Sequence, residues 1–185
     1  KKTQSRRIKG KAIIVSNHKR LFDFVLLMYL FLGRDIYTII GEQMYRKNKL
    51  FSWFLNKIGG IKVERDAYDF RFLGKSIEVL NKGKVIEIFP EGRLPLKEEK
   101  ELLPFKPSFV YLALESGAPI IPIYTNGSYA KKERAKVVIG EPIDAQALYN
   151  DTLTEKENID YICNYVSSYI KDLGKIINEE KEKEN

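Results

Sequence analysis

Short apolar runs and longer segments of helical periodicity alternate along this chain of 185 residues. The apolar runs that suit strands cover residues 12–16, 36–40, 60–64, 85–89, 120–124 and 135–140. The segments with helical spacing cover residues 22–32, 49–58, 69–82, 107–117 and 155–177. Strands that alternate with helices in this way favour an α/β fold whose sheet is built with crossover connections.

The last helical segment carries the clearest pattern. Its apolar positions recur every three or four residues along one face, and they are Ile159, Ile162, Val166, Ile170, Leu173 and Ile177. No internal repeat and no linker rich in serine or glycine interrupts the chain. We therefore expect one domain over residues 1–178, followed by a charged tail at 179–185 that frays.

Composition and charge narrow the class of protein. With 44% hydrophobic and 31% charged residues, the chain is typical of a globular domain. The formal net charge is +7, and eight basic residues precede the first acidic one, Asp23. Such a basic block suits an anionic membrane surface, where each Lys or Arg contributes about 1 kcal/mol. It also suits nucleic acid, or a solvated tail without a partner.

Several classes of protein are disfavoured. The longest apolar stretch, 24–32, is about half the roughly 20 residues that span a bilayer, so we expect the chain to lie on a membrane if it meets one. The single cysteine, Cys163, excludes an intramolecular disulfide and is expected to be structural. One histidine and one cysteine lie far apart, and no glycine-rich nucleotide loop is present, so the sequence predicts no metal site and no cofactor.

The only histidine, His18, follows the first predicted strand in the motif Asn-His-x4-Asp at residues 17–23. An imidazole takes up and returns a proton near neutral pH. The carboxylate of Asp23 follows five positions later, across a strand-to-helix turn, where it can fold back and orient the ring. The alternative is a surface histidine beside a helix cap.

Three further motifs end a predicted strand or form one. Residues 89–93, Phe-Pro-Glu-Gly-Arg, place the Glu91 carboxylate at a strand end, where α/β sheets bind ligands. Residues 59–66 bring Arg65 to another strand end, and its planar guanidinium suits a phosphate group. Residues 118–123, Ala-Pro-Ile-Ile-Pro-Ile, form an apolar strand bracketed by prolines. Taken singly, each is more simply explained as an ordinary turn, a surface ion pair or a buried strand.

Together and in this order, the four motifs resemble the lysophosphatidic acid acyltransferase family of the glycerolipid acyltransferase superfamily. The family's Asn-His-x4-Asp is present at 17–23, its Gly-rich turn and Val-x-Arg strand end at 59–65, its Phe-Pro-Glu-Gly at 89–92 and its Pro-Ile-x-Pro at 119–122. A Phe-Lys pair at 105–106 falls where the family commonly has one. The resemblance implies a single-domain α/β fold, similar to glycerol-3-phosphate acyltransferase, with a mixed sheet and flanking helices.

The resemblance also implies a role for each motif. His18 would be the general base toward the acceptor hydroxyl, with Asp23 orienting it, and the hydroxyl would attack an acyl thioester without an acyl-enzyme. A general base typically contributes about 10²–10⁴-fold to a rate. Glu91 and Gly92 would bind the glycerol part of the acceptor, and Arg65 its phosphate. The residues that would shape the site or contact the acyl donor are Pro119, Ile120 and Pro122.

Two departures from the family pattern concern positive charge near the site. The family continues Phe-Pro-Glu-Gly with Thr-Arg-Ser, whereas here Arg93-Leu94-Pro95 follows, so the hydroxyl is absent and the arginine comes one place early. Arg93 stays a candidate phosphate ligand. The family often has Ser or Thr two places after the histidine, where this chain has Arg20. We hypothesise that Lys19 and Arg20 favour a doubly charged phosphomonoester acceptor.

These features predict an enzyme that acylates lysophosphatidic acid with acyl-CoA or acyl-carrier protein as donor. We expect it at the cytoplasmic face of the cell membrane, as a peripheral or monotopic protein without a nucleic-acid partner. The basic N-terminus would contact the anionic surface together with Phe24, Met28, Phe31, Phe51, Trp53 and Phe54, although core packing explains these six equally well. Two alternatives stay open. One is a different acceptor, such as glycerol-3-phosphate, dihydroxyacetone phosphate or another lysophospholipid. The other is a non-catalytic basic module that binds anionic lipid or nucleic acid.

Overall fold

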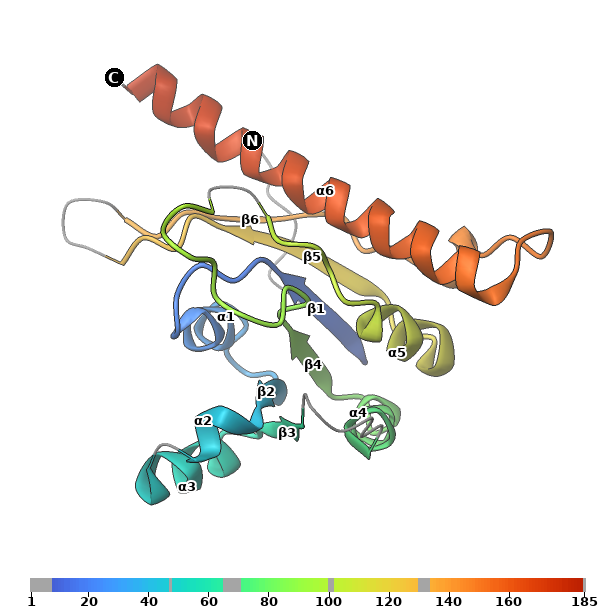
Figure 1. Ribbon diagram of the computed structural model, residues 1–185, viewed down its shortest axis with the longest axis horizontal. Coiled ribbons are helices and arrows are strands. Elements are labelled where there is room, and N and C mark those ends of the chain that lie inside the picture. Colours follow the sequence, from blue (N-terminus) through green and yellow to red (C-terminus); the bar gives the residue numbers. More distant parts are fainter. Residues whose placement is uncertain (1–7, 47, 65–70, 100–101, 130–133, 185) are drawn as a thin grey trace.

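The computed structural model describes residues 8–46, 48–64, 71–99, 102–129 and 134–184, and it shows a sheet with helices on both faces (Figure 1). Within these residues the sheet has six strands in the order β3-β2-β4-β1-β5-β6. They are β1 (Ala12–Ser16), β2 (Ile36–Gly41), β3 (Ile61–Val63), β4 (Val85–Ile88), β5 (Ile120–Thr125) and β6 (Val137–Ile139). Neighbouring strands are parallel except β5 and β6, which are antiparallel, so the predicted mixed α/β sheet is confirmed.

The centre of the sheet is completely buried. All five residues of β1 and all four of β4 are buried, which is typical of parallel strands covered on both faces. β1 lies between β4 and β5, with Ala12 opposite Val85 and Ser16 opposite Ile123. Because these strands run in parallel, the loops that follow their carboxyl ends meet at one edge of the sheet.

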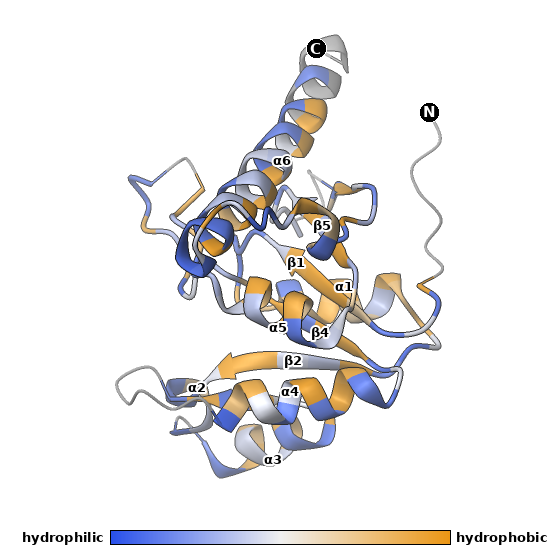
Figure 2. Ribbon diagram, turned by 90° about the vertical axis from the view of Figure 1, so that its right-hand side faces the viewer, coloured by the Kyte–Doolittle hydropathy of each residue, from blue (hydrophilic) through white to orange (hydrophobic). Residues whose placement is uncertain are grey.

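Helices cover the two faces of the sheet unequally. They are α1 (Asp23–Leu30), α2 (Glu42–Arg46), α3 (Lys49–Lys57), α4 (Arg71–Asn81), α5 (Ser108–Ser116) and α6 (Glu155–Glu184), with a 3-10 turn at Gln146–Leu148. One face packs against α4, α5 and α6 in the larger apolar core, and the other packs against Leu27 of α1 and Phe31, the residue that follows it. A further cluster joins α1 to α3 through Phe24 and Leu55. Figure 2 shows apolar residues, in orange, along β1 and β2 and on α4 and α5.

The long helix α6 confirms the clearest pattern in the sequence. It lies along β5 and β6 (Figure 1), and its six predicted apolar positions between 159 and 177 are all buried. A capping box fixes its start: the Thr154 hydroxyl accepts the N–H of Glu157, and the Glu157 carboxylate accepts the N–H of Thr154. The helix continues to Glu184, so residues 179–184 are helical where the sequence predicts a fraying tail. The domain limits themselves stay a prediction.

The remaining predicted elements are present with shifted limits. The strands predicted at 60–64 and 135–140 are shorter, because each is an edge strand that pairs on one side only. The helix predicted at 69–82 corresponds to α4, and its first two positions lie outside the described residues. The short helix α2 was not predicted, since five residues are too few to show a helical repeat. In the part of the chain that the structure describes, no helix has the length and apolar character that crossing a membrane requires.

For two of the six residues expected at a membrane surface, the prediction is wrong, because their side chains are buried. Phe24 on α1 and Phe31 just after it are only 6% and 2% exposed, because both pack into apolar clusters. Met28 and Phe51 are half-buried, whereas Trp53 and Phe54 on α3 are exposed. Four other apolar side chains on and beside α1 are exposed, although the sequence does not predict them at a surface: Phe22, Val25, Tyr29 and Leu32.

Candidate active site

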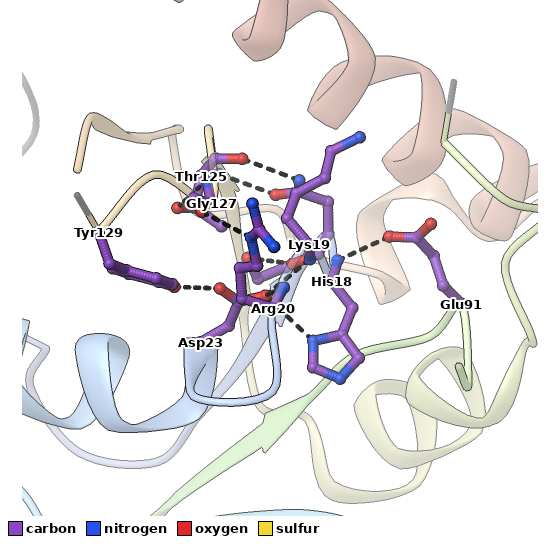
Figure 3. Close-up of polar contacts among 10 residues, drawn as sticks. His18, Lys19, Arg20, Asp23, Glu91, Thr125, Gly127 and Tyr129 are labelled. Carbon is purple, nitrogen blue, oxygen red and sulfur yellow. Dashed lines mark hydrogen bonds and ion pairs between the residues drawn. The ribbon is translucent and has the colours of Figure 1, made fainter. Parts of the chain in front are cut away.

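His18 and Asp23 meet across the turn between β1 and α1. His18 lies just beyond the carboxyl end of β1, and Asp23 is the first residue of α1. The imidazole Nδ1 lies 3.1 Å from the Asp23 Oδ2. The Asp23 side chain is completely buried, and that of His18 is 17% exposed. Nδ1 therefore faces the carboxylate, and the other ring nitrogen, Nε2, points away from it (Figure 3).

Backbone donors hold the Asp23 carboxylate in place. The N–H groups of Lys19 and Arg20 donate to the same Oδ2 at 2.7 and 2.8 Å. These bonds close the turn, so the five-residue spacing in the sequence brings the two side chains into contact. The predicted contact is present, while the catalytic roles of both residues stay proposals.

The Phe-Pro-Glu-Gly motif supports the histidine. The imidazole stacks on Phe89, with ring centroids 4.4 Å apart and planes at 27°. Glu91 accepts the His18 N–H through Oε1 at 2.7 Å and the Leu103 N–H through Oε2 at 2.8 Å. Burial raises the pKa of Glu91, and these two N–H groups oppose the shift. Glu91 does not line the cavity beside the histidine, so its placement favours support of the His18 loop over the implied contact with the acceptor's glycerol.

Lys19 and Arg20 are not brought to the cavity. The Arg20 Nε donates to the Gly127 carbonyl at 3.3 Å, and the Lys19 side chain packs closely against Gly127. Figure 3 shows both side chains extending away from the Nε2 edge of the imidazole. Neither residue lines the cavity, so their placement does not support the phosphate contact expected from the sequence.

The Pro-Ile-x-Pro motif shapes the site only indirectly. Its predicted residues lie on or just before β5, beside β1, and none of them lines the cavity: Pro119, Ile120 and Pro122. The last residue of β5, Thr125, lies beside Asn17. The Asn17 side chain donates to the Thr125 carbonyl at 2.9 Å and accepts the Thr125 N–H at 2.8 Å. This buried pair anchors the chain directly before His18.

A cavity of about 580 Å³ opens beside the imidazole, and His18 lies on its wall. Most of the wall is apolar, with side chains from several elements that include Leu21, Phe24, Ile40, Leu55, Phe72 and Phe89. Two cations, Arg93 and Lys106, line the same cavity. An apolar cavity with a few polar groups is typical of a binding site for a small amphipathic molecule. Among the described residues, no three His, Cys, Asp or Glu side chains are grouped as metal ligands.

The turn after β4 brings Gly92 and Arg93 to the cavity, as expected. Gly92 has a φ of +70°, and a side chain there would meet Lys106 at 3.3 Å. The Arg93 guanidinium donates to both oxygens of Glu99 at 2.7 and 2.6 Å. This hydrogen bonding lowers the pKa of Glu99 to about 2. Arg65, the other expected phosphate ligand, lies outside the described residues.

Glu87 in β4 is a polar residue near the site to which no sequence pattern points. It is completely buried, and its Oε2 accepts the Thr38 hydroxyl at 2.7 Å. Within the described residues its Oε1 has no hydrogen-bond partner. Burial raises the pKa of Glu87 well above its ordinary value, and the charge of nearby Asp23 adds to the effect. The folded protein therefore favours the protonated, neutral acid at this position.

We expect Glu87→Gln to stabilise the protein increasingly as the pH rises. Above the ordinary pKa of 4.5 the unfolded chain loses the Glu87 proton, while the folded chain keeps it up to a higher pH. The wild-type free energy of unfolding therefore falls with pH across this window, by up to about 1.4 kcal/mol per pH unit. A neutral glutamine removes this loss and still accepts the Thr38 hydroxyl.

Urea unfolding at pH 5 and pH 8 measures the effect of Glu87→Gln. Glu115→Gln, at an exposed position of α5, is the matched control, and its free energy of unfolding should differ from that of wild type by the same amount at both pH values. A difference between wild type and Glu87→Gln that is the same at both pH values would contradict the raised pKa.

This chain is similar to known proteins that are acyltransferases by name. A family model described as Acyltransferase matches residues 1–126. A Saccharomyces cerevisiae 1-acyl-sn-glycerol-3-phosphate acyltransferase is 25% identical over 157 residues, which cover 77% of this chain and 50% of the relative. A protein of the same name from Limnanthes douglasii is 26% identical over 88% of this chain and 57% of its own length. One from Haemophilus influenzae is 24% identical over 79% and 63%. The chain thus spans about half to under two thirds of these relatives.

A solved structure confirms the fold. The crystal structure of the 1-acyl-sn-glycerophosphate (LPA) acyltransferase PlsC from Thermotoga maritima matches with a TM-score of 0.66 and 22% sequence identity. The match covers 94% of this chain and 70% of that one. The family model covers more than half of the chain and includes the His18–Asp23 turn and the Phe-Pro-Glu-Gly motif. The chain belongs to the acyltransferase family.

Proposed function

We propose that the chain transfers a fatty acyl group from an acyl thioester to the free hydroxyl of 1-acyl-glycerol-3-phosphate, which gives phosphatidic acid. The observation that carries this proposal is the His18–Asp23 pair, whose histidine lies on the wall of an apolar cavity that Arg93 and Lys106 also line. Apolar walls suit an acyl chain, and cations beside them suit a phosphate group. The names of the relatives support the same acceptor.

The proposed chemistry follows from the orientation of the imidazole. The His18 Nε2 accepts the proton of the acceptor hydroxyl while the hydroxyl oxygen attacks the thioester carbonyl. The Asp23 carboxylate stabilises the imidazolium that forms. The tetrahedral intermediate then breaks its C–S bond, and the imidazolium returns the proton to the leaving thiolate. The hydroxyl oxygen forms the new ester directly, so the reaction needs no acyl-enzyme.

The chain's only cysteine is poorly suited to form an acyl-enzyme. Cys163 is buried on α6 and does not line the cavity. Burial raises the pKa of its thiol to about 11, whereas a nucleophilic cysteine reacts as the thiolate. This supports direct transfer between the two substrates. We propose acyl-CoA or acyl-carrier protein as the donor, because both present an acyl thioester.

Exposed apolar side chains support contact with a membrane surface. Phe22, Val25, Tyr29 and Leu32 recur every three or four residues and remain exposed on and beside α1. Trp53 on α3 is also exposed, and the Lys57 ammonium lies 6.0 Å from the centre of its ring. Apolar side chains combined with cations suit the interface of an anionic bilayer. We propose that the protein acts as a peripheral enzyme at the cytoplasmic face of the cell membrane.

We expect Glu99→Gln to lower the KM for the phosphate-bearing acceptor by about two- to fivefold, with little change in kcat. Glu99 holds the Arg93 guanidinium in the ion pair described above, so it competes with an acceptor phosphate for the same donors. Loss of its charge removes this competition. Initial rates at varied lysophosphatidic acid measure the effect, and Glu98→Gln, one position earlier, is the matched control. An unchanged or raised KM would argue against Arg93 as a phosphate ligand.

A panel of acceptors tests the proposed function. Lysophosphatidic acid, glycerol-3-phosphate, dihydroxyacetone phosphate and lysophosphatidylcholine are supplied with the same labelled donor. The proposal predicts the highest kcat/KM with lysophosphatidic acid. A clear preference for another acceptor would support the proposed acyl transfer but contradict lysophosphatidic acid as the acceptor. Binding to anionic vesicles without turnover on any acceptor would favour a non-catalytic module.

A further inference from the structure

We propose that Tyr129 is a positioning residue for the His18–Asp23 pair. This inference rests on the proposed function for its catalytic consequence, whereas the contact behind it stands on the geometry alone. Tyr129 lies after β5, 106 positions from Asp23, and its hydroxyl donates to the Asp23 Oδ1. Figure 3 shows the phenol and the imidazole on opposite sides of the Asp23 carboxylate.

The two oxygens of Asp23 have separate tasks. Oδ2 faces the imidazole Nδ1 and also accepts the N–H groups of Lys19 and Arg20. These backbone bonds fix Oδ2, but a single fixed oxygen leaves the carboxylate able to rotate. The Tyr129 hydroxyl fixes the second oxygen, and two fixed oxygens define the carboxylate plane. The direction in which Oδ2 meets His18 therefore depends on Tyr129.

The segment that carries Tyr129 is itself held in place. The Thr125 hydroxyl accepts the Gly127 N–H at 3.2 Å, and the Gly127 carbonyl accepts the Arg20 Nε at 3.3 Å. The Asn126 side-chain oxygen accepts the Ser128 N–H at 3.1 Å. Together with the buried Asn17–Thr125 pair, these bonds join the segment 125–129 to the His18 loop at several points. The Tyr129 phenol therefore contacts Asp23 from a segment whose backbone is held in place.

Close packing allows the two segments to approach. Gly127 has a φ of +65°, and a side chain there would come within 2.3 Å of the Lys19 Cβ. Only glycine accommodates both the backbone conformation and the contact. Lys19 and Arg20 therefore pack directly against the segment 125–129 at Gly127. The two cations beside His18 therefore have a structural role, in place of the phosphate contact that the sequence predicts.

The phenol is suited to act as a permanent donor. Burial raises the pKa of Tyr129, and the hydrogen bond to the Asp23 carboxylate raises it further. The hydroxyl therefore keeps its proton throughout the neutral range and donates to Asp23 in both protonation states of His18. Tyr129 does not line the cavity, so its proposed effect on His18 passes through the Asp23 carboxylate.

The test uses the fact that the chain has one histidine. Proton and nitrogen NMR spectra of the imidazole then report His18 without overlap. We expect Tyr129→Phe to shift the His18 Nδ1 and Nδ1–H resonances in an otherwise wild-type protein. In an Asp23→Ala background, in which residue 23 has no polar side-chain atom for the phenol to contact, we expect no further shift. Tyr161→Phe, at a similarly exposed tyrosine of α6, is the matched control and should leave the imidazole spectrum unchanged.

Turnover measures the catalytic consequence. We expect Tyr129→Phe to lower kcat about tenfold, the loss typical of one hydrogen bond to a charged group, and to leave both KM values within about twofold. A purely structural role would lower the melting temperature without lowering kcat selectively over the two KM values. Unshifted imidazole resonances in Tyr129→Phe would overturn the proposed contact, whether or not the protein is an acyltransferase. Shifted resonances with an unchanged kcat would overturn the positioning role. An inactive wild-type protein with shifted resonances would overturn the proposed function and leave the contact established.

Discussion

Asp23→Asn should lower kcat by about 10²–10⁴-fold while the protein stays folded. The amide oxygen of asparagine can take the place of Oδ2 and still accept the Lys19 and Arg20 N–H groups. Its amide nitrogen would lie where the Tyr129 hydroxyl can accept from it. The substitution therefore preserves the turn and removes the negative charge. The imidazolium that forms during hydroxyl attack then loses its counter-charge.

Initial rates under donor and acceptor saturation measure the effect of Asp23→Asn. Asp172→Asn, at an exposed aspartate paired with Lys175 on α6, is the matched control and should have wild-type rates. Circular dichroism confirms that both variants are folded. A kcat for Asp23→Asn within about threefold of wild type would mean that the carboxylate does not support a general base.

His18→Ala should lower kcat by a similar factor, about 10²–10⁴-fold, and leave the KM values for donor and acceptor nearly unchanged. The imidazole contributes its Nε2 to the proposed reaction, whereas the apolar wall and the cations of the cavity remain in the variant. The double variant His18→Ala/Asp23→Asn should be no slower than His18→Ala alone, because Asp23 acts through the imidazole. Additive losses would show that Asp23 has a separate task.

Much of the fold is visible in the sequence because its signals are local. The buried strands β1 and β4 are continuous apolar runs, and the buried face of α6 repeats at helical spacing. The His18–Asp23 contact is equally local, since one turn closes it. The order of the four motifs carries the resemblance to the acyltransferase family, which the family model confirms.

The parts of the site that sequence patterns missed depend on contacts between distant residues. Tyr129 reaches Asp23 and Thr125 reaches Asn17 only because β5 pairs with β1, more than 100 residues away along the chain. Glu87 was overlooked because a single glutamate in an apolar strand gives no sign of which face it occupies. In the structure it is completely buried and bonded to Thr38 on the neighbouring strand β2.

Charge in the sequence was a poor guide to the phosphate site. Lys19 and Arg20 lie next to His18 in the chain, but the turn directs their side chains toward Gly127 and away from the cavity. Arg93 and Lys106 reach the cavity from later loops. The direction of a side chain in a turn depends on the backbone, which sequence position alone does not define.

The most direct test of the central claim is acyl transfer by the protein itself. Acyl-CoA, or acyl-carrier protein loaded with a labelled acyl chain, is mixed with lysophosphatidic acid in micelles, and labelled phosphatidic acid is measured for wild type and His18→Ala. We predict labelled phosphatidic acid with wild type, one thiol released for each ester formed, and a product rate at least about 10²-fold lower with His18→Ala. Equal product from both proteins, or thiol release without phosphatidic acid, would contradict the proposed function.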